Sequence, residues 1–174
     1  MIEGISGVTL VLGGARSGKS TFAEQLVAGS GLAGVYIATA EAHDGEMDAR
    51  IAAHRARRGD SWITVEAPLD LAGAIAREAK RDRIVLVDCL TLWVTNLMRA
   101  GEDIDAAFGG LLAALEGAGG PVVLVSNEVG QGIVPDNAMA RAFRDHAGIL
   151  HQRVAAAADT VYFVIAGLPH KLKG

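Results

Sequence analysis

Two kinds of segment, which differ in their pattern of apolar and polar residues, follow one another along the chain. Short apolar runs bounded by turn residues predict strands at 8–12, 35–39, 62–65, 84–88, 122–126 and 161–165. Between them, apolar positions recur at helical spacing and predict helices at 19–28, 44–58, 69–81, 90–99, 104–117 and 137–157. Strands that alternate with helices in this way predict an α/β fold: a mostly parallel sheet with helices on both faces, in a single domain over residues 1–174.

The segment after the first predicted strand carries the clearest functional signal. It matches the phosphate-loop pattern G-x-x-x-x-G-K-[ST] in full, through Gly13, Gly14, Ala15, Arg16, Ser17, Gly18, Lys19 and Ser20. In such a loop, backbone N–H groups surround phosphate oxygens, and the helix that follows adds partial positive charge. We expect Lys19 to reach the β- and γ-phosphates and Ser20 to ligate Mg²⁺. A glycine turn that contains Lys-Ser by chance is the alternative, at under about 1% for a chain of this length. The motif narrows the fold class to a P-loop NTPase-like, RecA-like sheet.

Ligands of such sheets collect at the carboxyl ends of the strands, so residues just after each strand should converge on the phosphate loop. Asp88 ends the apolar run 84–88. It is therefore expected to hold Mg²⁺, directly or through water, or to accept a proton from a substrate hydroxyl. A helix cap is the alternative role. In the apolar segment that follows, Thr91, Thr95 and Asn96 are polar exceptions.

The predicted helix 44–58 ends in a dense positive cluster. His54 lies on the same line of the helix as Glu46 and Arg50, away from the apolar face, and Arg55 to Arg58 follow it. Two interpretations stay open from the pattern alone. The segment is either a solvated helix end, or a site where arginines hold phosphates while a neutral imidazole acts as acid, base or nucleophile.

A long, polar, glycine-punctuated segment at 126–135 suggests a binding loop rather than a simple connection. Asp136 or Asn137 can cap the helix that follows. Its apolar stripe is expected to include Met139, Phe143, Leu150 and Val154. Its other faces carry Arg141, Arg144, Asp145, His146 and His151. Most of these are expected to lie on a solvated surface or in an oligomer contact, and the spacing assigns them no further role.

The composition argues against several classes of function. The net charge of −4 disfavours broad binding to nucleic acid or to anionic membranes. A lone cysteine, Cys89, cannot form an intramolecular disulfide, and its default role is core packing in a reducing compartment. The first residues lack a secretory pattern, and no run is long enough to span a bilayer. We therefore expect a cytoplasmic protein.

Five segments together resemble one enzyme family over nearly the whole chain. They read GGARSGKS, YIATAEAHDGEMDARIAAHRARR, WITVEAP, VDCLTLWVTNLM and SNEVGQGIVPDNAMARAFRDHAGILHQRVAAAAD. This combination resembles the bifunctional adenosylcobinamide kinase and adenosylcobinamide-phosphate guanylyltransferase family of cobalamin biosynthesis. The resemblance implies two reactions. ATP or GTP first phosphorylates the aminopropanol hydroxyl of adenosylcobinamide, and GTP then donates GMP to adenosylcobinamide-phosphate through a GMP-histidine intermediate, which gives adenosylcobinamide-GDP and pyrophosphate.

The resemblance also implies roles for individual residues. The guanylylated histidine falls on His54. The implied nucleotide contacts are the phosphate loop, Ala38, Thr39, Ala40, Arg55, Ala56, Arg57, Arg58, Glu66 and Asp88. Members of the family form a propeller-like trimer, which implies a homotrimer with the corrinoid in a cleft between subunits. Two positions depart from the family pattern: Asp88 stands where some members have Glu, and His151 stands where Asn is common.

Two other functions compete with this interpretation. A single-activity small-molecule kinase with a phosphate loop would use Lys19, Ser20 and Asp88 but would need no nucleophilic His54. A non-enzymatic nucleotide-sensing module would bind the nucleotide without turnover.

Overall fold

The computed structural model describes residues 5–40 and 62–174. The strands are β1 (Val8–Gly13), β2 (Ala33–Ala38), β3 (Ile63–Glu66), β4 (Arg83–Asp88), β5 (Val122–Asn127), β6 (Thr160–Ile165) and β7 (Leu168–Lys173). The helices are α1 (Lys19–Gly29), α3 (Leu71–Glu78), α4 (Leu90–Ala100), α5 (Ile104–Glu116) and α6 (Ala138–Ala157).

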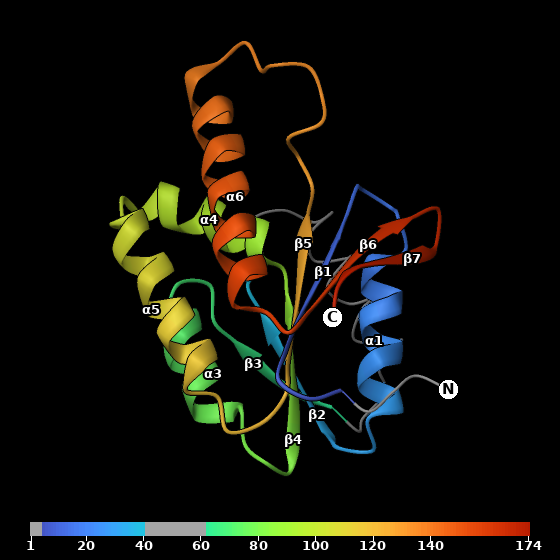
Figure 1. Ribbon diagram of the computed structural model, residues 1–174. Helices are drawn as coiled ribbons and strands as arrows, with labels where there is room; N and C mark the ends of the chain where they lie inside the picture. Colours follow the sequence, from blue (N-terminus) through green and yellow to red (C-terminus); the bar gives the residue numbers. More distant parts are fainter. Residues whose placement is uncertain (1–4, 41–61) are drawn as a thin grey trace.

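The seven strands form one sheet in the order β3-β2-β4-β5-β1-β6-β7 (Figure 1). All neighbouring pairs are parallel except β6 and β7, which are antiparallel. Helix α1 covers one face, and α3, α4, α5 and α6 lie on the other. The predicted α/β class, with a mostly parallel sheet covered on both faces, is confirmed.

Each face of the sheet has its own core because neighbouring residues of a strand point to opposite faces. On the side of α1, Leu26 packs with Val11 and Leu86. On the other side, Leu10 packs in the cluster that contains the two largest fully buried side chains, Trp93 and Phe108. The central strands are buried on both faces, which is why they appear in the sequence as continuous apolar runs.

Three helices begin at a side-chain cap that satisfies a free N–H group of the first turn. Asp70 accepts from Gly73 N, and Asp103 accepts from Ala106 N. Asn137, rather than Asp136, caps α6 by accepting from Ala140 N. Among residues 5–40 and 62–174, no helix is both long and apolar enough to cross a membrane.

The predicted elements within the described residues lie within three residues of those observed. The predicted helix 44–58 falls outside the described residues. Strand β7 was not predicted, because every residue of Leu168–Lys173 is exposed and the segment has no apolar run. Met139 was wrongly assigned to the apolar stripe of α6, since 72% of its surface is exposed.

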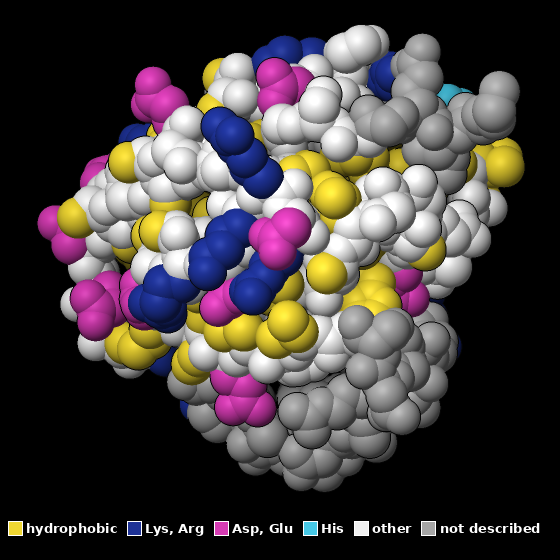
Figure 2. Space-filling view, turned by 90° about the horizontal axis from the view of Figure 1, so that it is seen from below, with side chains coloured by type: hydrophobic (Ala, Val, Ile, Leu, Met, Phe, Trp, Pro, Cys, Tyr) yellow, Lys and Arg dark blue, Asp and Glu magenta, His cyan; other side chains and the backbone are white. Residues whose placement is uncertain are grey.

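The edge of the sheet at the amino ends of the strands carries mixed charges. Figure 2 shows this side, where basic and acidic side chains lie next to one another. Two ion pairs of the structure are Arg83–Glu78 and Arg153–Asp105. A cavity of about 530 Å³ at this edge is lined partly by Val8 and Arg153, at the opposite end of β1 from the phosphate loop.

Candidate active site

The carboxyl ends of the central strands meet at one edge of the sheet, as the sequence predicts. Gly13 at the end of β1 pairs in register with Asn127 at the end of β5. Asp88 at the end of β4 pairs with Ala38 of β2 and Val125 of β5. The phosphate loop and Asp88 therefore lie at the same edge, separated by β5.

Several carbonyl groups of the phosphate loop accept hydrogen bonds from donors of the protein. Glu128 N donates to Gly13 O at 3.0 Å, and Gly167 N donates to Ser17 O at 2.7 Å. Gly14 O accepts from Ser17 N and from Lys19 Nζ. Within the described residues, the N–H groups of Ala15, Arg16, Gly18 and Lys19 donate to no protein acceptor. These unused N–H groups fit an anion, because backbone donors without a protein acceptor remain available to a ligand.

Two glycines of the motif are required by close contacts with β6 and with the turn that follows it. A Cβ atom at Gly13 would lie 2.5 Å from Ser17 Oγ and 2.7 Å from Val164 O of β6. Gly18 has φ +94°, and a Cβ atom there would lie 3.0 Å from Gly167 Cα. Larger residues at either position would push the loop off the sheet.

Lys19 lies inside the loop and is 8% exposed. Its ammonium donates to Gly14 O at 3.0 Å. Burial lowers the pKa of Lys19 below its ordinary value, while the charges of Asp88 and Cys89 oppose that shift. The electrostatic influence of Asp88 on Lys19 agrees with the placement of both residues at one edge of the sheet.

The oxygen donors present suit Mg²⁺ rather than a metal held only by protein side chains. Among the residues that the structure describes, no group of three His, Cys, Asp or Glu side chains is placed to bind a metal. Ser20 lies in the first turn of α1 beside the loop, and Asp88 ends β4. One hydroxyl and one carboxylate fit Mg²⁺, because this ion keeps several waters and takes further oxygens from substrate phosphates.

Thr39 clamps the chain where it leaves β4. Its hydroxyl accepts from Cys89 N at 2.8 Å and donates to Cys89 O at 2.7 Å, and Thr39 N donates to Asp88 O at 3.4 Å. The side chain of Asn96 extends the clamp by donating to Thr39 O at 2.7 Å. Thr39 is fully buried, so its hydroxyl serves the protein in this structure. Direct contact with a nucleotide stays a prediction for this residue.

The polar exceptions of α4 belong to the same network. Thr91 Oγ1 accepts from Asn127 Nδ2 at 3.0 Å and lies 3.2 Å from Cys89 Sγ. Thr95 donates to Thr91 O within the helix. Cys89 is buried, as predicted, and burial is the main cause that raises the pKa of its thiol to about 11. The start of α4 is thus joined through side chains to the ends of β2 and β5.

The other residues predicted to contact the nucleotide lie farther from the phosphate loop or outside the described residues. Ala38 ends β2 and pairs with Glu66, which ends β3. Because β3 is four strand spacings from β1, Glu66 lies about 19 Å from the phosphate loop. A contact by Glu66 would thus be made to a part of the ligand distant from the phosphates. Ala40 lies just beyond β2, whereas His54, Arg55, Ala56, Arg57 and Arg58 fall outside the described residues.

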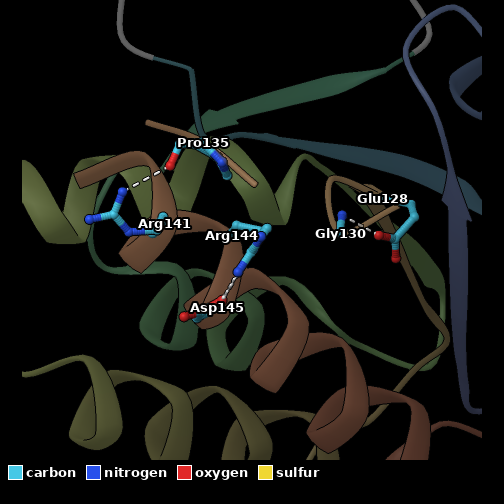
Figure 3. Close-up of polar contacts among 6 residues, drawn as sticks. All are labelled: Glu128, Gly130, Pro135, Arg141, Arg144 and Asp145. Atoms are coloured by element: carbon cyan, nitrogen blue, oxygen red, sulfur yellow. Dashed lines mark hydrogen bonds and ion pairs between the residues drawn. The ribbon is translucent and has the colours of Figure 1, made fainter. Parts of the chain in front are cut away.

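The segment between β5 and α6 is held by its own polar contacts (Figure 3). Glu128 accepts from Gly130 N, and Arg141 donates to Pro135 O at 2.9 Å. Near its tip, Ile133 is 97% exposed and Val134 is 59% exposed. The segment therefore presents apolar side chains to the outside while its base is fixed to the sheet.

His151 is an exception to the expectation that most polar residues of α6 lie on a solvated surface or in an oligomer contact. It is buried, and a hydrogen bond of 2.7 Å joins its Nε2 to Ser126 Oγ. Its Nδ1 lies 3.9 Å from a carboxylate oxygen of Glu128. Burial lowers the pKa of His151, and the charge of Glu128 partly opposes this. Its partner Ser126 lies on β5, in a different segment of the sequence, so the pattern of the helix alone could not predict that His151 is buried.

Comparisons with known proteins agree with this geometry. A family model described as cobinamide kinase / cobinamide phosphate guanyltransferase matches residues 9–172. The bifunctional adenosylcobalamin biosynthesis protein CobP of Pseudomonas aeruginosa is 53% identical over 95% of this chain and 96% of its own length. CobU of Salmonella typhimurium is 44% identical over 94% and 98%.

Solved structures with little sequence similarity share the fold. The RadB recombinase aligns over 92% of this chain and 76% of its own, with a TM-score of 0.55 and 19% identity. The flagellar accessory protein FlaH from Methanocaldococcus jannaschii aligns over 96% and 78%, with a TM-score of 0.51 and 10% identity. These matches confirm the predicted RecA-like class.

Proposed function

The chain belongs to the cobinamide kinase / cobinamide phosphate guanyltransferase family, and we propose that one phosphate loop serves both of its reactions while His54 carries GMP between them. The protein is a bifunctional enzyme of adenosylcobalamin biosynthesis, with cobinamide kinase and cobinamide-phosphate guanylyltransferase activities. One observation supports a shared nucleotide site. The loop has N–H groups without a protein acceptor, the side chain of Lys19 lies in the loop, and the charge of Asp88 acts on that side chain.

In the kinase reaction, the aminopropanol hydroxyl of adenosylcobinamide attacks the γ-phosphorus of ATP or GTP. The bond to the bridging oxygen of the β-phosphate breaks, and the nucleoside diphosphate leaves. The hydroxyl proton passes to Asp88 or to water. The N–H groups of Ala15, Arg16 and Gly18 hold the phosphates, and Lys19 neutralises charge that develops on the leaving group.

In the guanylyl transfer, neutral His54 attacks the α-phosphorus of GTP. A P–N bond forms, the bond to the β-phosphate oxygen breaks, and pyrophosphate leaves. An oxygen of adenosylcobinamide-phosphate then attacks the same phosphorus and releases the imidazole, which gives adenosylcobinamide-GDP. The arginines at 55, 57 and 58 would neutralise the departing pyrophosphate. Two in-line steps let one nucleotide site serve a bulky acceptor.

Mg²⁺ would be held by Ser20 and, directly or through water, by Asp88, and it would supply charge neutralisation on the phosphates. The shorter side chain of Asp88, in place of the Glu of some family members, favours contact through water. A homotrimer and a cytoplasmic location complete the proposal. Sedimentation equilibrium would detect the trimer, and a monomer at micromolar concentration would contradict it.

The decisive experiment for this proposal is a test for a covalent adduct between the protein and labelled GMP. Incubation with GTP labelled at the α-phosphate should give an acid-labile protein adduct in the wild type and none in His54→Ala. His170→Ala is the matched control, because His170 is an exposed histidine of β7 and should leave the adduct unchanged. Binding of GTP without any adduct would refute the role of His54 and favour a single-activity kinase. Lys19→Ala should prevent use of the triphosphate altogether.

A further inference from the structure

We propose that Gly167, in the turn between β6 and β7, is a positioning residue for the phosphate loop. Its N–H group holds the Ser17 carbonyl outward, and this directs the Gly18 N–H group toward the bound phosphates. The inference rests on the proposed use of the loop for nucleotide binding. It assigns a role to a hairpin that the sequence pattern did not predict.

The turn after β6 and strand β7 contribute no buried side chain to the core. Every residue from Ile165 through β7 is exposed, so the outer strand buries no side chain. Its polar contacts are specific instead. Lys173 Nζ donates to Ala155 O and Ala156 O at the end of α6, and Gly167 N donates to Ser17 O at 2.7 Å. The turn is thereby fastened directly to the phosphate loop.

The turn backbone packs against the loop at close range. A Cβ atom at Gly18 would lie 3.0 Å from Gly167 Cα and 3.6 Å from Gly167 N. Ala166 and Gly167 both have positive φ, at +52° and +79°, as a tight hairpin turn requires. This conformation aims the Gly167 N–H group at the Ser17 carbonyl. The short distance leaves no room for water between the two backbones.

The effect on the ligand follows from the planarity of the peptide bond. In a trans peptide, the C=O and the next N–H point in opposite directions. A Ser17 carbonyl held toward Gly167 therefore keeps the Gly18 N–H group facing away from the hairpin. That N–H donates to no acceptor within the described residues, so it is available for a phosphate oxygen. Glu128 N acts on the Gly13 carbonyl in the same way from the other side.

Replacement of the Gly167 N–H group alone tests the proposal. Incorporation of glycolic acid at position 167 converts that amide into an ester, which removes the donor and preserves the shape of the turn. Lactic acid at position 166 is the matched control, because the Ala166 N–H has no acceptor among the described hydrogen bonds. GTP affinity is measured by calorimetry, and the unfolding midpoint is measured in urea for both proteins.

We expect the ester at 167 to weaken GTP binding about three- to tenfold, which corresponds to one lost hydrogen bond, and the ester at 166 to leave it unchanged. Ala166→Gly should also bind GTP normally, whereas Gly167→Ala should bind it more weakly because of its positive φ. Equal GTP affinities of the two esters would overturn the proposal, whether both match the wild type or both are weakened to the same extent. If Lys19→Ala binds GTP as tightly as the wild type, the phosphate-loop assignment itself fails instead.

Discussion

Replacement of Thr39 by valine would remove the hydroxyl that holds the chain after β4. Valine matches the shape of threonine, so the substitution leaves no cavity. It does remove the acceptor for Cys89 N and the donor for Cys89 O, which lie 2.8 Å and 2.7 Å from the hydroxyl. Cys89 O keeps a second donor, because Trp93 N also donates to it at 3.2 Å. Cys89 N has no other acceptor among the described hydrogen bonds, and the residue is buried, so water cannot replace the lost partner of this N–H group.

The expected cost follows from those two contacts. The buried Cys89 N left without its partner costs about 1–3 kcal/mol, and the lost hydrogen bond to Cys89 O costs about 0.5–1.5 kcal/mol, so Thr39→Val should lower the free energy of unfolding by about 1.5–4.5 kcal/mol. That is a large share of the roughly 5–15 kcal/mol that stabilises an ordinary domain. Thr39→Ser keeps the hydroxyl and loses one methyl group, which should cost only about 1 kcal/mol.

Urea unfolding followed by tryptophan fluorescence measures both variants, because Trp93 is buried close to this network. Trp93 Nε1 donates to Leu69 O, so its emission should change when the region opens. If Thr39→Val destabilises the protein no more than Thr39→Ser does, the two hydrogen bonds to Cys89 do not hold this segment and the reasoning is refuted.

Two further predictions concern protonation. Because burial lowers the pKa of His151 below 6.5, the unfolded chain binds the extra proton first, so stability should fall as the pH drops below about 6.5. His151→Asn should flatten that dependence in urea titrations at pH 5 and 7, and an unchanged slope would contradict this origin. The pKa of about 11 keeps the Cys89 thiol protonated at neutral pH, and stability should decline as the pH rises above about 9. A thiol reagent at pH 8 should therefore react with Cys89 only as fast as the protein opens, so rapid reaction of the native protein would show that the thiol is accessible.

Much of the site could be predicted because it is continuous in the sequence. The phosphate loop follows β1 directly, and Asp88 ends an apolar run, so local pattern and strand-end position were enough. The polar exceptions in α4 were also visible. Their partners were not, because Thr91 bonds to Asn127, and Asn96 bonds to Thr39, across the sheet.

By itself, the sequence determined the order along the chain of β1 to β6 and of the described helices, the phosphate loop and the family, since periodicity and contiguous motifs are local properties. Tertiary structure alone decided which polar groups meet. Burial of His151 on Ser126, the clamp of Thr39 on Cys89 and the hydrogen bond from Gly167 to Ser17 each join residues from distant segments. Strand β7 belongs with them: it pairs through backbone hydrogen bonds and buries no side chain, so it leaves no hydrophobic pattern to find.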